Sequence, residues 1–331
     1  MKPLLLPPNQ FHRFYSGGSR IDALHGVPEG EDGRPEDWVG STATSFGSDT
    51  EGLSRLEDGR VLRDAIADDP EGFLGPDHVE RFGSDPALLV KLLDAGQRLP
   101  VHFHPGRAFA RERLGVRFGK TESWIILEAE PDAAVHVGPR EPLDPATVRG
   151  WVDAQDADEM LSALRRVPVA AGDAVLVPAG TLHAIGAGIL LLELQEPTDL
   201  SVLVEWKPFG VTDGSEHLQL GWEAALEAMD TEPADVDALT GGGEGNLLPD
   251  AADPYFRAER VRGGDELGPS FAVLLVTGGE GALRCSDGDE LALRRGTTVL
   301  VPYAAGATTL SGDLEAIRCL PPIPTAGEGA W

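Results

Sequence analysis

The sequence predicts a mainly β protein built from two related β-barrels. Short apolar runs alternate with Gly, Pro and Asp along the chain, a pattern typical of strands in a sandwich or barrel. Two segments also repeat: GDAVLVPAGTLHAIGAG from Gly172 and GTTVLVPYAAGATTLSG from Gly296 both run from Gly through Val-Leu-Val to Pro and then turn. The fifth residue after this Pro is His183 in the first copy and Ala307 in the second. We therefore expect the second barrel to lack the metal ligands of the first.

Helical patterns are few, and the sequence places them in short insertions between strands. A plausible N-cap at Asp144 precedes spaced apolar positions, and SEHLQLGWEAALEAM from Ser215 has a similar rhythm. The Gly-rich and acidic stretch 231–254 is the candidate linker. We expect an N-terminal metal-binding domain (1–210) with a helical insertion near 144–166, then a helical segment and linker (211–250), then a degenerate C-terminal barrel (251–331).

Composition limits the partners of the chain. Its 331 residues include 55 acidic and 27 basic side chains, a formal charge of -28 that disfavours nucleic acid and anionic membrane surfaces. No apolar run approaches a membrane span, and the leucines near the N-terminus stop at a Pro-Pro pair, so we expect a cytoplasmic protein. Cys285 and Cys319 are too few, and too far from the histidines, for a disulfide scaffold or a cysteine zinc site.

The stretch VHFHP contains the strongest signal for chemistry. Residues i and i+2 of a strand face the same side, so His102 and His104 can reach one metal if this stretch is extended, as Pro105 favours. Glu122 opens the next predicted strand, and His183 follows the PAG turn. Three imidazoles and one carboxylate suit zinc, iron, manganese, nickel or cobalt. The remaining histidines are expected to be structural: His12, His25, His78, His136 and His217.

The two histidine segments together resemble the cupin superfamily, whose jelly-roll barrels carry an H-x-H strand and a later G-x5-P-x-G-x2-H strand. More narrowly, PEDWVGS, ALLVKLLDAGQRLPVHFHP, GKTESWIIL and VPAGTLHAIGAGILLLELQEPTDLSVLVEW resemble successive blocks of the type I phosphomannose isomerases. This resemblance implies a double cupin fold and a zinc-dependent aldose–ketose isomerase that interconverts mannose 6-phosphate and fructose 6-phosphate through a cis-enediol. It also implies His104, Glu122 and His183 as metal ligands, Lys120 as the active-site lysine and Glu193 as an acid facing the sugar.

Two positions depart from the family pattern. His102 stands where the family has Gln, and an imidazole should hold the metal at least as well. Leu203 stands where the family has Arg, so a cation and a fork of donors near the sugar are lost. The lost Arg keeps two alternatives open, an isomerase of an unphosphorylated or different sugar and a non-catalytic sugar-binding metallocupin. The set of three His and one Glu keeps open a third, an iron cupin oxygenase.

The base of an isomerase is sought between Glu193 and Lys120, since one is a carboxylate and the other needs a lowered pKa to act. Each also has a structural alternative, as an orienting partner of a ligand or as a solvated charge. A substrate phosphate would have to be met by Lys207, Arg107 or Arg111. Trp38 and Trp124 could stack on a sugar, although buried tryptophans are commoner in barrels.

Overall fold

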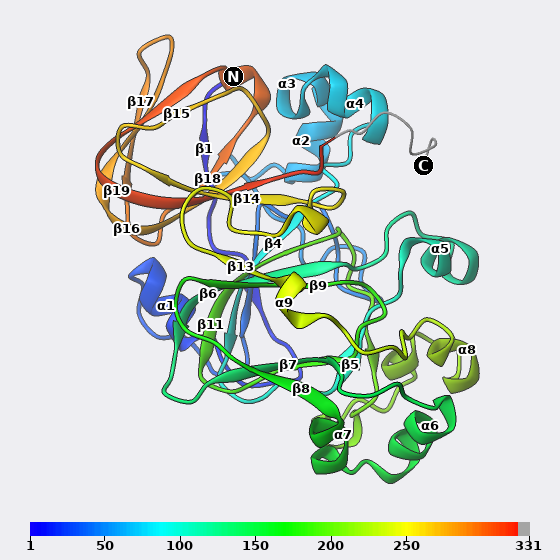
Figure 1. Cartoon of the computed structure of the whole chain (residues 1–331). Helices are drawn as coiled ribbons and strands as arrows, with labels where there is room; N and C mark the ends of the chain where they lie inside the picture. The colour runs from blue at the N-terminus through cyan, green and yellow to red at the C-terminus, as the bar shows by residue number, and fades with distance from the viewer. Residues whose placement is uncertain (324–331) are drawn as a thin grey trace.

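The computed structural model describes residues 1–323 and is mainly β, as predicted (Figure 1). The strands are β1 (Leu4–Leu5), β2 (Gln10–Phe11), β3 (Glu36–Val39), β4 (Leu89–Ala95), β5 (His102–Phe103), β6 (Glu122–Ala129), β7 (Ala134–Pro139), β8 (Leu164–Pro168), β9 (Asp173–Val177), β10 (His183–Ile185), β11 (Ile189–Gln195), β12 (Val202–Leu203), β13 (Thr240–Gly242), β14 (Arg257–Arg262), β15 (Glu266–Leu267), β16 (Ala272–Cys285), β17 (Glu290–Arg294), β18 (Thr298–Val301) and β19 (Thr308–Leu320).

The helices are short and lie mostly outside the sheets (Figure 1). The α-helices are α1 (Ser19–His25), α2 (Leu62–Asp68), α3 (Pro70–Leu74), α4 (Pro76–Phe82), α5 (Arg107–Phe109), α6 (Pro145–Ala154), α7 (Ala157–Ala163), α8 (Trp222–Leu226) and α9 (Val236–Leu239). The single turns are η1 (Ala110–Leu114), η2 (Lys207–Phe209), η3 (Ser215–His217), η4 (Asp250–Ala252) and η5 (Tyr303–Ala305).

The first barrel is formed by two sheets that face each other. A seven-stranded sheet has the order β13-β9-β6-β11-β4-β3-β2, and a five-stranded sheet has the order β12-β5-β10-β7-β8. One apolar cluster, with Leu93 and Trp124 from the first sheet and Val135 and Ile185 from the second, fills the space between them. Every residue of β4 and β11 is buried, because this sheet is covered on both faces, and that explains their nearly continuous apolar sequences.

The second barrel follows the order β1-β18-β16-β19-β14, with β15 pairing with β19 and β17 pairing with β16. Its interior is apolar, with Leu274, Val299 and Leu310 among the buried members. A further apolar cluster joins the two barrels, since it contains Leu192 of β11 and Leu275 of β16. In Figure 1 the second barrel lies at the upper left, beside α2 to α4.

Several elements differ from the sequence-based expectations. The insertion near 144–166 is helical, as expected, and forms α6 and α7. The predicted helix from Ser215 is interrupted, because Leu218 and Gln219 adopt positive φ angles of 56° and 62° between η3 and α8. Helices α1 to α4 were not expected at all.

Two strands cross the expected domain boundaries. β1, within the expected N-terminal domain, pairs with β18 of the second barrel, and β13, within the expected linker, pairs with β9 of the first. The three-unit division therefore stays a proposal, and its C-terminal end at 324–331 lies outside the described residues. Among the helices of residues 1–323, none combines the length and apolar character needed to cross a membrane.

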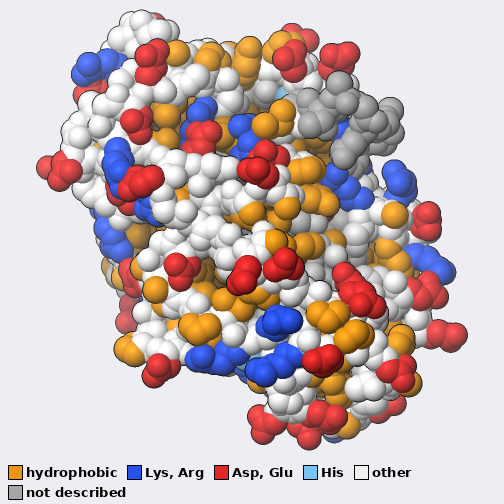
Figure 2. Space-filling view, viewed as in Figure 1, with side chains coloured by type: hydrophobic (Ala, Val, Ile, Leu, Met, Phe, Trp, Pro, Cys, Tyr) orange, Lys and Arg blue, Asp and Glu red, His pale blue; other side chains and the backbone are white. Residues whose placement is uncertain are grey.

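On one face of the molecule the acidic side chains lie in scattered positions (Figure 2). Figure 2 shows Asp and Glu distributed over the visible face, with Lys and Arg between them. The negative charge on this face is therefore dispersed over the surface and not gathered at one place, as expected for charges whose main role is contact with solvent.

Candidate metal centre and active site

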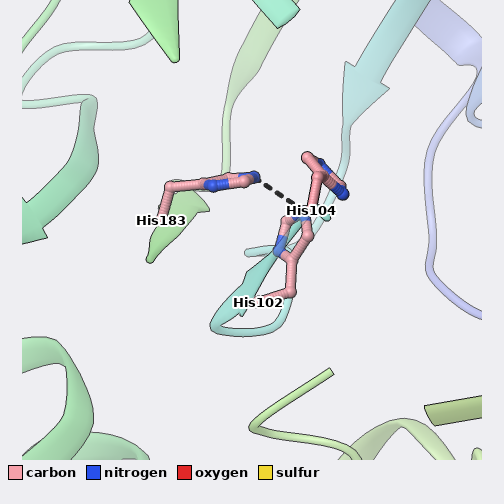
Figure 3. A group of neighbouring side chains, drawn as sticks. All are labelled: His102, His104 and His183. Atoms are coloured by element: carbon pink, nitrogen blue, oxygen red, sulfur yellow. Dashed lines mark hydrogen bonds between the residues drawn. The ribbon is translucent and has the colours of Figure 1, made fainter. Parts of the chain in front are cut away.

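The three predicted histidines meet inside the first barrel (Figure 3). His102 on β5 and His183 on β10 are direct partners across neighbouring antiparallel strands, and His104 follows two residues after His102. Their ligand nitrogens all lie within 4.8 Å of one another. All three side chains are buried, so solvent does not compete for these nitrogens.

Backbone carbonyls fix the orientation of each ring. Nδ1 of His102 donates to the Pro100 carbonyl, Nδ1 of His104 to the Leu200 carbonyl, and Nδ1 of His183 to the Thr181 carbonyl, each at 2.8 Å. Because a carbonyl oxygen only accepts, each Nδ1 carries a proton, so that a ring in its neutral form presents an Nε2 lone pair to the centre.

These converging lone pairs need a cation between them. Nε2 of His102 and Nε2 of His183 lie 2.9 Å apart, the contact dashed in Figure 3. A proton is a poor solution, since burial and the neighbouring histidines hold the pKa of His102 well below its usual value. Burial and the charge of Lys120 likewise lower the pKa of His104 to about 3. A metal cation would satisfy all three nitrogens at once.

Glu122, the first residue of β6, brings a carboxylate to the same centre. Its Oε2 lies 3.0 Å from Nε2 of His104, and its Oε1 lies 3.3 Å from Nε2 of His183. Tetrahedral ligands bound at about 2.0–2.1 Å from zinc are separated from each other by about 3.3 Å. Nε2 of His104 and Oε2 of Glu122 are buried and lack a partner with hydrogen-bond geometry. The donor set therefore fits a divalent metal.

A row of polar and aromatic side chains crosses the sheet beside this centre. The register pairs Trp38 of β3 with Lys91 of β4, Lys91 with Glu193 of β11, and Glu193 with Trp124 of β6. Residues paired in this way share one face of the sheet, here the interior of the barrel. Lys91 Nζ lies 3.9 Å from Glu193 Oε2, and Lys120 Nζ lies 3.9 Å from Glu193 Oε1.

The charges in this row influence one another. Lys120 Nζ also lies 3.2 Å from Glu122 Oε2, so it joins the row to the metal centre. Burial raises the pKa of Glu193 to about 8, with Glu122 acting in the same direction against Lys91 and Lys120. The pKa of Lys120 is raised, because the attraction of Glu122 and Glu193 outweighs the effect of burial. Lys120 is therefore an ammonium cation.

A cavity of about 460 Å³ opens onto these groups. Lys91, Lys120, Glu122 and Glu193 line it together with His102. The N-terminal segment, strand β3 and later loops contribute further wall residues, among them His12, Arg13, Phe14, Tyr15, Glu36, Phe46, Asp199 and Val211 to Asp213. A monosaccharide fits in such a space, which is of the size that small-molecule sites have.

Of the remaining predicted site residues, only Leu203 lines the cavity. It is the cross-strand partner of His102. Lys207 is exposed on η2 and is not among the cavity-lining residues, and neither are Arg107 and Arg111. Trp38 and Trp124 are fully buried and also lie outside the lining, so neither offers a face to a sugar.

The histidines expected to be structural behave in different ways. His25 contacts Asp37 and the Gly296 carbonyl, and His78 contacts the Asp85 carbonyl, so both have polar partners in the fold. His12, by contrast, is exposed and lines the cavity mouth. Sequence reasoning gave no role to His12.

Comparison with known proteins identifies the family. No protein-family model matches the chain. Its sequence is 30% identical over 335 residues to the mannose-6-phosphate isomerase of Streptococcus mutans, and the match covers 96% of this chain and 97% of that protein. The chain belongs to the mannose-6-phosphate isomerase family. The predicted family and the predicted enzyme class, an isomerase, are thereby confirmed.

Solved structures of mannose-6-phosphate isomerases share the fold. The Bacillus subtilis enzyme superposes with a TM-score of 0.77 at 23% identity, covering 96% of this chain and 99% of that one. A mannose 6-phosphate isomerase bound with zinc and yttrium superposes with a TM-score of 0.73 at 17% identity, covering 98% and 100%. The family fold therefore extends over both barrels.

Sequence reasoning missed several members of the site. Lys91 lies within the apolar strand ALLVKLL and was given no role of its own, and neither were Arg13, Tyr15, Glu36 and Asp199. A single charge inside an otherwise apolar strand was the available signal for Lys91, since buried charges need partners. No comparable signal marks the other four.

Proposed function

We propose that the chain is a metal-dependent aldose–ketose isomerase that interconverts mannose 6-phosphate and fructose 6-phosphate. The observation that carries the proposal is the convergence of three Nε2 lone pairs and a carboxylate beside the row formed by Lys91, Glu193 and Lys120. The substrate pair follows the names of the relatives, which are mannose-6-phosphate isomerases.

His102, His104, Glu122 and His183 would hold the metal, and zinc is our first choice for this donor set. Iron, manganese, cobalt and nickel suit the same ligands. When bound, a divalent metal supplies positive charge that stabilises negative charge on the sugar oxygens. The three carbonyls that accept from the Nδ1 atoms would keep the rings aimed at it.

The protein groups would move one proton between two carbons of the sugar. In the aldose-to-ketose direction, a base removes the C2 proton while O1 takes up a proton, which gives the cis-enediol; a proton then returns to C1 as the O2 hydroxyl gives up its proton and becomes the carbonyl. Glu193 is the candidate for removing the proton, because the raised pKa of Lys120 keeps that side chain an ammonium group, which can return a proton but not remove one. Lys91 and Lys120 flank Glu193, so their ammonium groups can donate hydrogen bonds to sugar oxygens as negative charge develops there.

A second candidate is the same reaction on an unphosphorylated sugar. Every Lys and Arg of the cavity lining is already paired with carboxylates: Lys120 with Glu122 and Glu193, Lys91 with Glu36 and Glu193, and Arg13 with Glu36 and Asp199. Leu203 presents an apolar surface to the same cavity. Both observations favour a substrate without a dianionic group.

A coupled isomerase assay on protein of measured metal content tests the proposal. Mannose 6-phosphate and free mannose are offered side by side, with zinc and then with the other divalent metals. Turnover of the phosphate ester supports the leading candidate, and turnover of mannose alone supports the second. If neither sugar is turned over and the iron-loaded protein takes up oxygen, the protein is an oxygenase and not an isomerase. If a sugar binds without turnover, the protein is a sugar-binding protein.

A further inference from the structure

We propose that Glu36 is a positioning residue that fixes the ammonium group of Lys91 in the cavity, an inference that rests on the proposed isomerase function. Glu36 lies on β3, two residues before Trp38, and faces the barrel interior from the strand next to β4. Its side chain and that of Lys91 are both buried.

Lys91 is held at three points. Its Nζ lies 3.5 Å from Oε2 of Glu36, 3.9 Å from Oε2 of Glu193 and 4.6 Å from the centre of the Trp38 ring. The strand register sets this arrangement, since Lys91 lies between Trp38 and Glu193 on neighbouring strands. A buried lysine loses much rotamer freedom and is stable only with such partners.

Glu36 has no acceptor position left for a substrate. An ionised carboxylate offers about four lone-pair sites. Oε1 accepts from Arg13 Nε at 3.1 Å and from the Tyr15 hydroxyl, and Oε2 accepts from Trp38 Nε1 at 2.7 Å and faces Lys91. These four groups occupy both oxygens of the carboxylate. Glu36 can therefore act on the reaction only through a neighbouring side chain.

Lys91 is the neighbour of Glu36 that still has an N–H donor available for a substrate. An ammonium group has three N–H donors, and Lys91 forms ion pairs with the carboxylates of Glu36 and Glu193 at distances of 3.5 and 3.9 Å. At least one donor therefore remains for a sugar hydroxyl in the cavity that Lys91 lines. The other partners of Glu36 support this direction of action, because Arg13 is in turn fixed by Asp199 at 3.2 Å through two hydrogen bonds. Glu36 is therefore the fixed member of the pair.

A double-mutant cycle on the metal-loaded full chain tests the inference. Glu36→Gln keeps the shape of the side chain and removes its charge, and we expect kcat to fall by roughly 10- to 100-fold while KM changes by less than about threefold. In the Lys91→Met background the same substitution should change kcat by less than about twofold, because residues acting as one unit are not additive. Metal content and the unfolding midpoint are measured on every variant.

Asp37→Asn is the matched control, since it removes a buried carboxylate from the next residue of β3, which contacts Asn9 and His25 and does not line the cavity. Its kcat should stay within about threefold of the parent. If Glu36→Gln does not fold, Glu36→Asp, which keeps the charge and shortens the reach, takes its place in the cycle with the same expected non-additivity. Equal losses in the parent and in the Lys91→Met background, or an unchanged kcat in Glu36→Gln, would overturn the inference.

Crystal structures of the variants give a readout that does not depend on turnover. Nζ of Lys91 should leave its position beside Glu193 in Glu36→Gln and keep it in Asp37→Asn. A Lys91 side chain that stays in place in Glu36→Gln would also overturn the inference. A parent protein that is inactive on every sugar would instead reject the proposed function, so the two failures are distinguishable.

Discussion

The two barrels carry the same strand and turn but use them differently. In the first, β9 leads through Pro178 to His183, which points at the metal centre; in the second, β18 leads through Pro302 to Ala307. The described residues of the second barrel contain no comparable group of metal-ligating side chains. Its interior is closed by Leu274, Val299 and other apolar residues.

This contrast shows that the shared strand and turn do not by themselves form a metal site. The first barrel has a site because β5, β6 and β10 each bring a donor to one point, with a carbonyl behind each imidazole. The second barrel fills its interior with apolar side chains, which stabilises the fold.

The largest expected effect comes from His183, which stands in the first copy of the repeated segment where the second copy has Ala307. His183→Ala should lose the tightly held metal and lower kcat/KM by about a thousandfold or more, equivalent to roughly 4 kcal/mol of transition-state stabilisation. Metal analysis after gel filtration and the coupled assay measure both effects. The matched variant Ala307→His should gain no metal, since no group of potential metal ligands is found in the part of its barrel that the structure describes. One retained metal per chain in His183→Ala would contradict the site assignment.

Core truncations in the two barrels should separate stability from catalysis. Leu274→Ala, in the second barrel, should cost about 2–5 kcal/mol of unfolding free energy, because a fully buried leucine leaves a cavity. Its kcat per folded molecule should not change. Leu191→Ala, two residues before Glu193 in the first barrel, should cost a similar free energy and also lower kcat. Urea unfolding and kinetics below the transition provide the values; equal kcat losses would reject the division of roles.

A positive charge introduced beside the metal centre should test whether the chain prefers the phosphorylated or the free sugar. Leu203→Arg places a guanidinium in the cavity next to His102, and we expect the ratio of kcat/KM for mannose 6-phosphate to that for mannose to rise about tenfold, or roughly 1.4 kcal/mol. Leu203→Met is the uncharged control of similar volume. A ratio that is the same in both variants would show that the phosphate is held elsewhere.

The smallest effect concerns the junction between the barrels. His25, at the end of α1, contacts Asp37 of β3 at 2.8 Å and the Gly296 carbonyl before β18 at 2.9 Å. Burial lowers the pKa of His25, but Asp37, the Gly296 carbonyl and Asp22 together raise it above the usual 6.5. Because the folded pKa is the higher one, this stabilisation is complete below about pH 6.5 and is lost as the pH rises through the folded pKa.

Urea unfolding of the parent and of His25→Gln at a series of pH values measures this term. The difference in unfolding free energy between the two proteins should shrink as the pH rises. His12→Gln, at an exposed position, is the control and should follow the parent at every pH. A difference that grows with pH would reverse the assigned sign.

The metal centre was predictable because its signals are local. The spacing of His102 and His104, the strand after Lys120 and the turn before His183 are each visible within a few residues. The part of the cavity wall formed by the N-terminal segment was not predictable, since Arg13 and Asp199 are 186 positions apart in the sequence. Pairing over such a distance depends on the closure of the barrel and leaves no periodic pattern.

Helices α2 to α4 were missed for a different reason. Each has only five to seven residues, too few for a helical period to show in the sequence. Pro70 and Pro76 in the first turns and the Asp69 cap were the available signals. The residue before a short helix is thus more informative here than its apolar pattern.

The pairing of β1 with β18 joins Leu4 to Leu300 and Leu5 to Val299. During synthesis at about 5–20 residues per second, the first strand therefore waits roughly 15–60 s for its partner to leave the ribosome. The N-terminal segment also carries Arg13 and Tyr15 to the cavity wall, only a few residues after that strand. The order of translation thus delays the pairing of β1 until almost the whole chain has been made, whereas β2, which leads to Arg13, can pair with β3 much sooner.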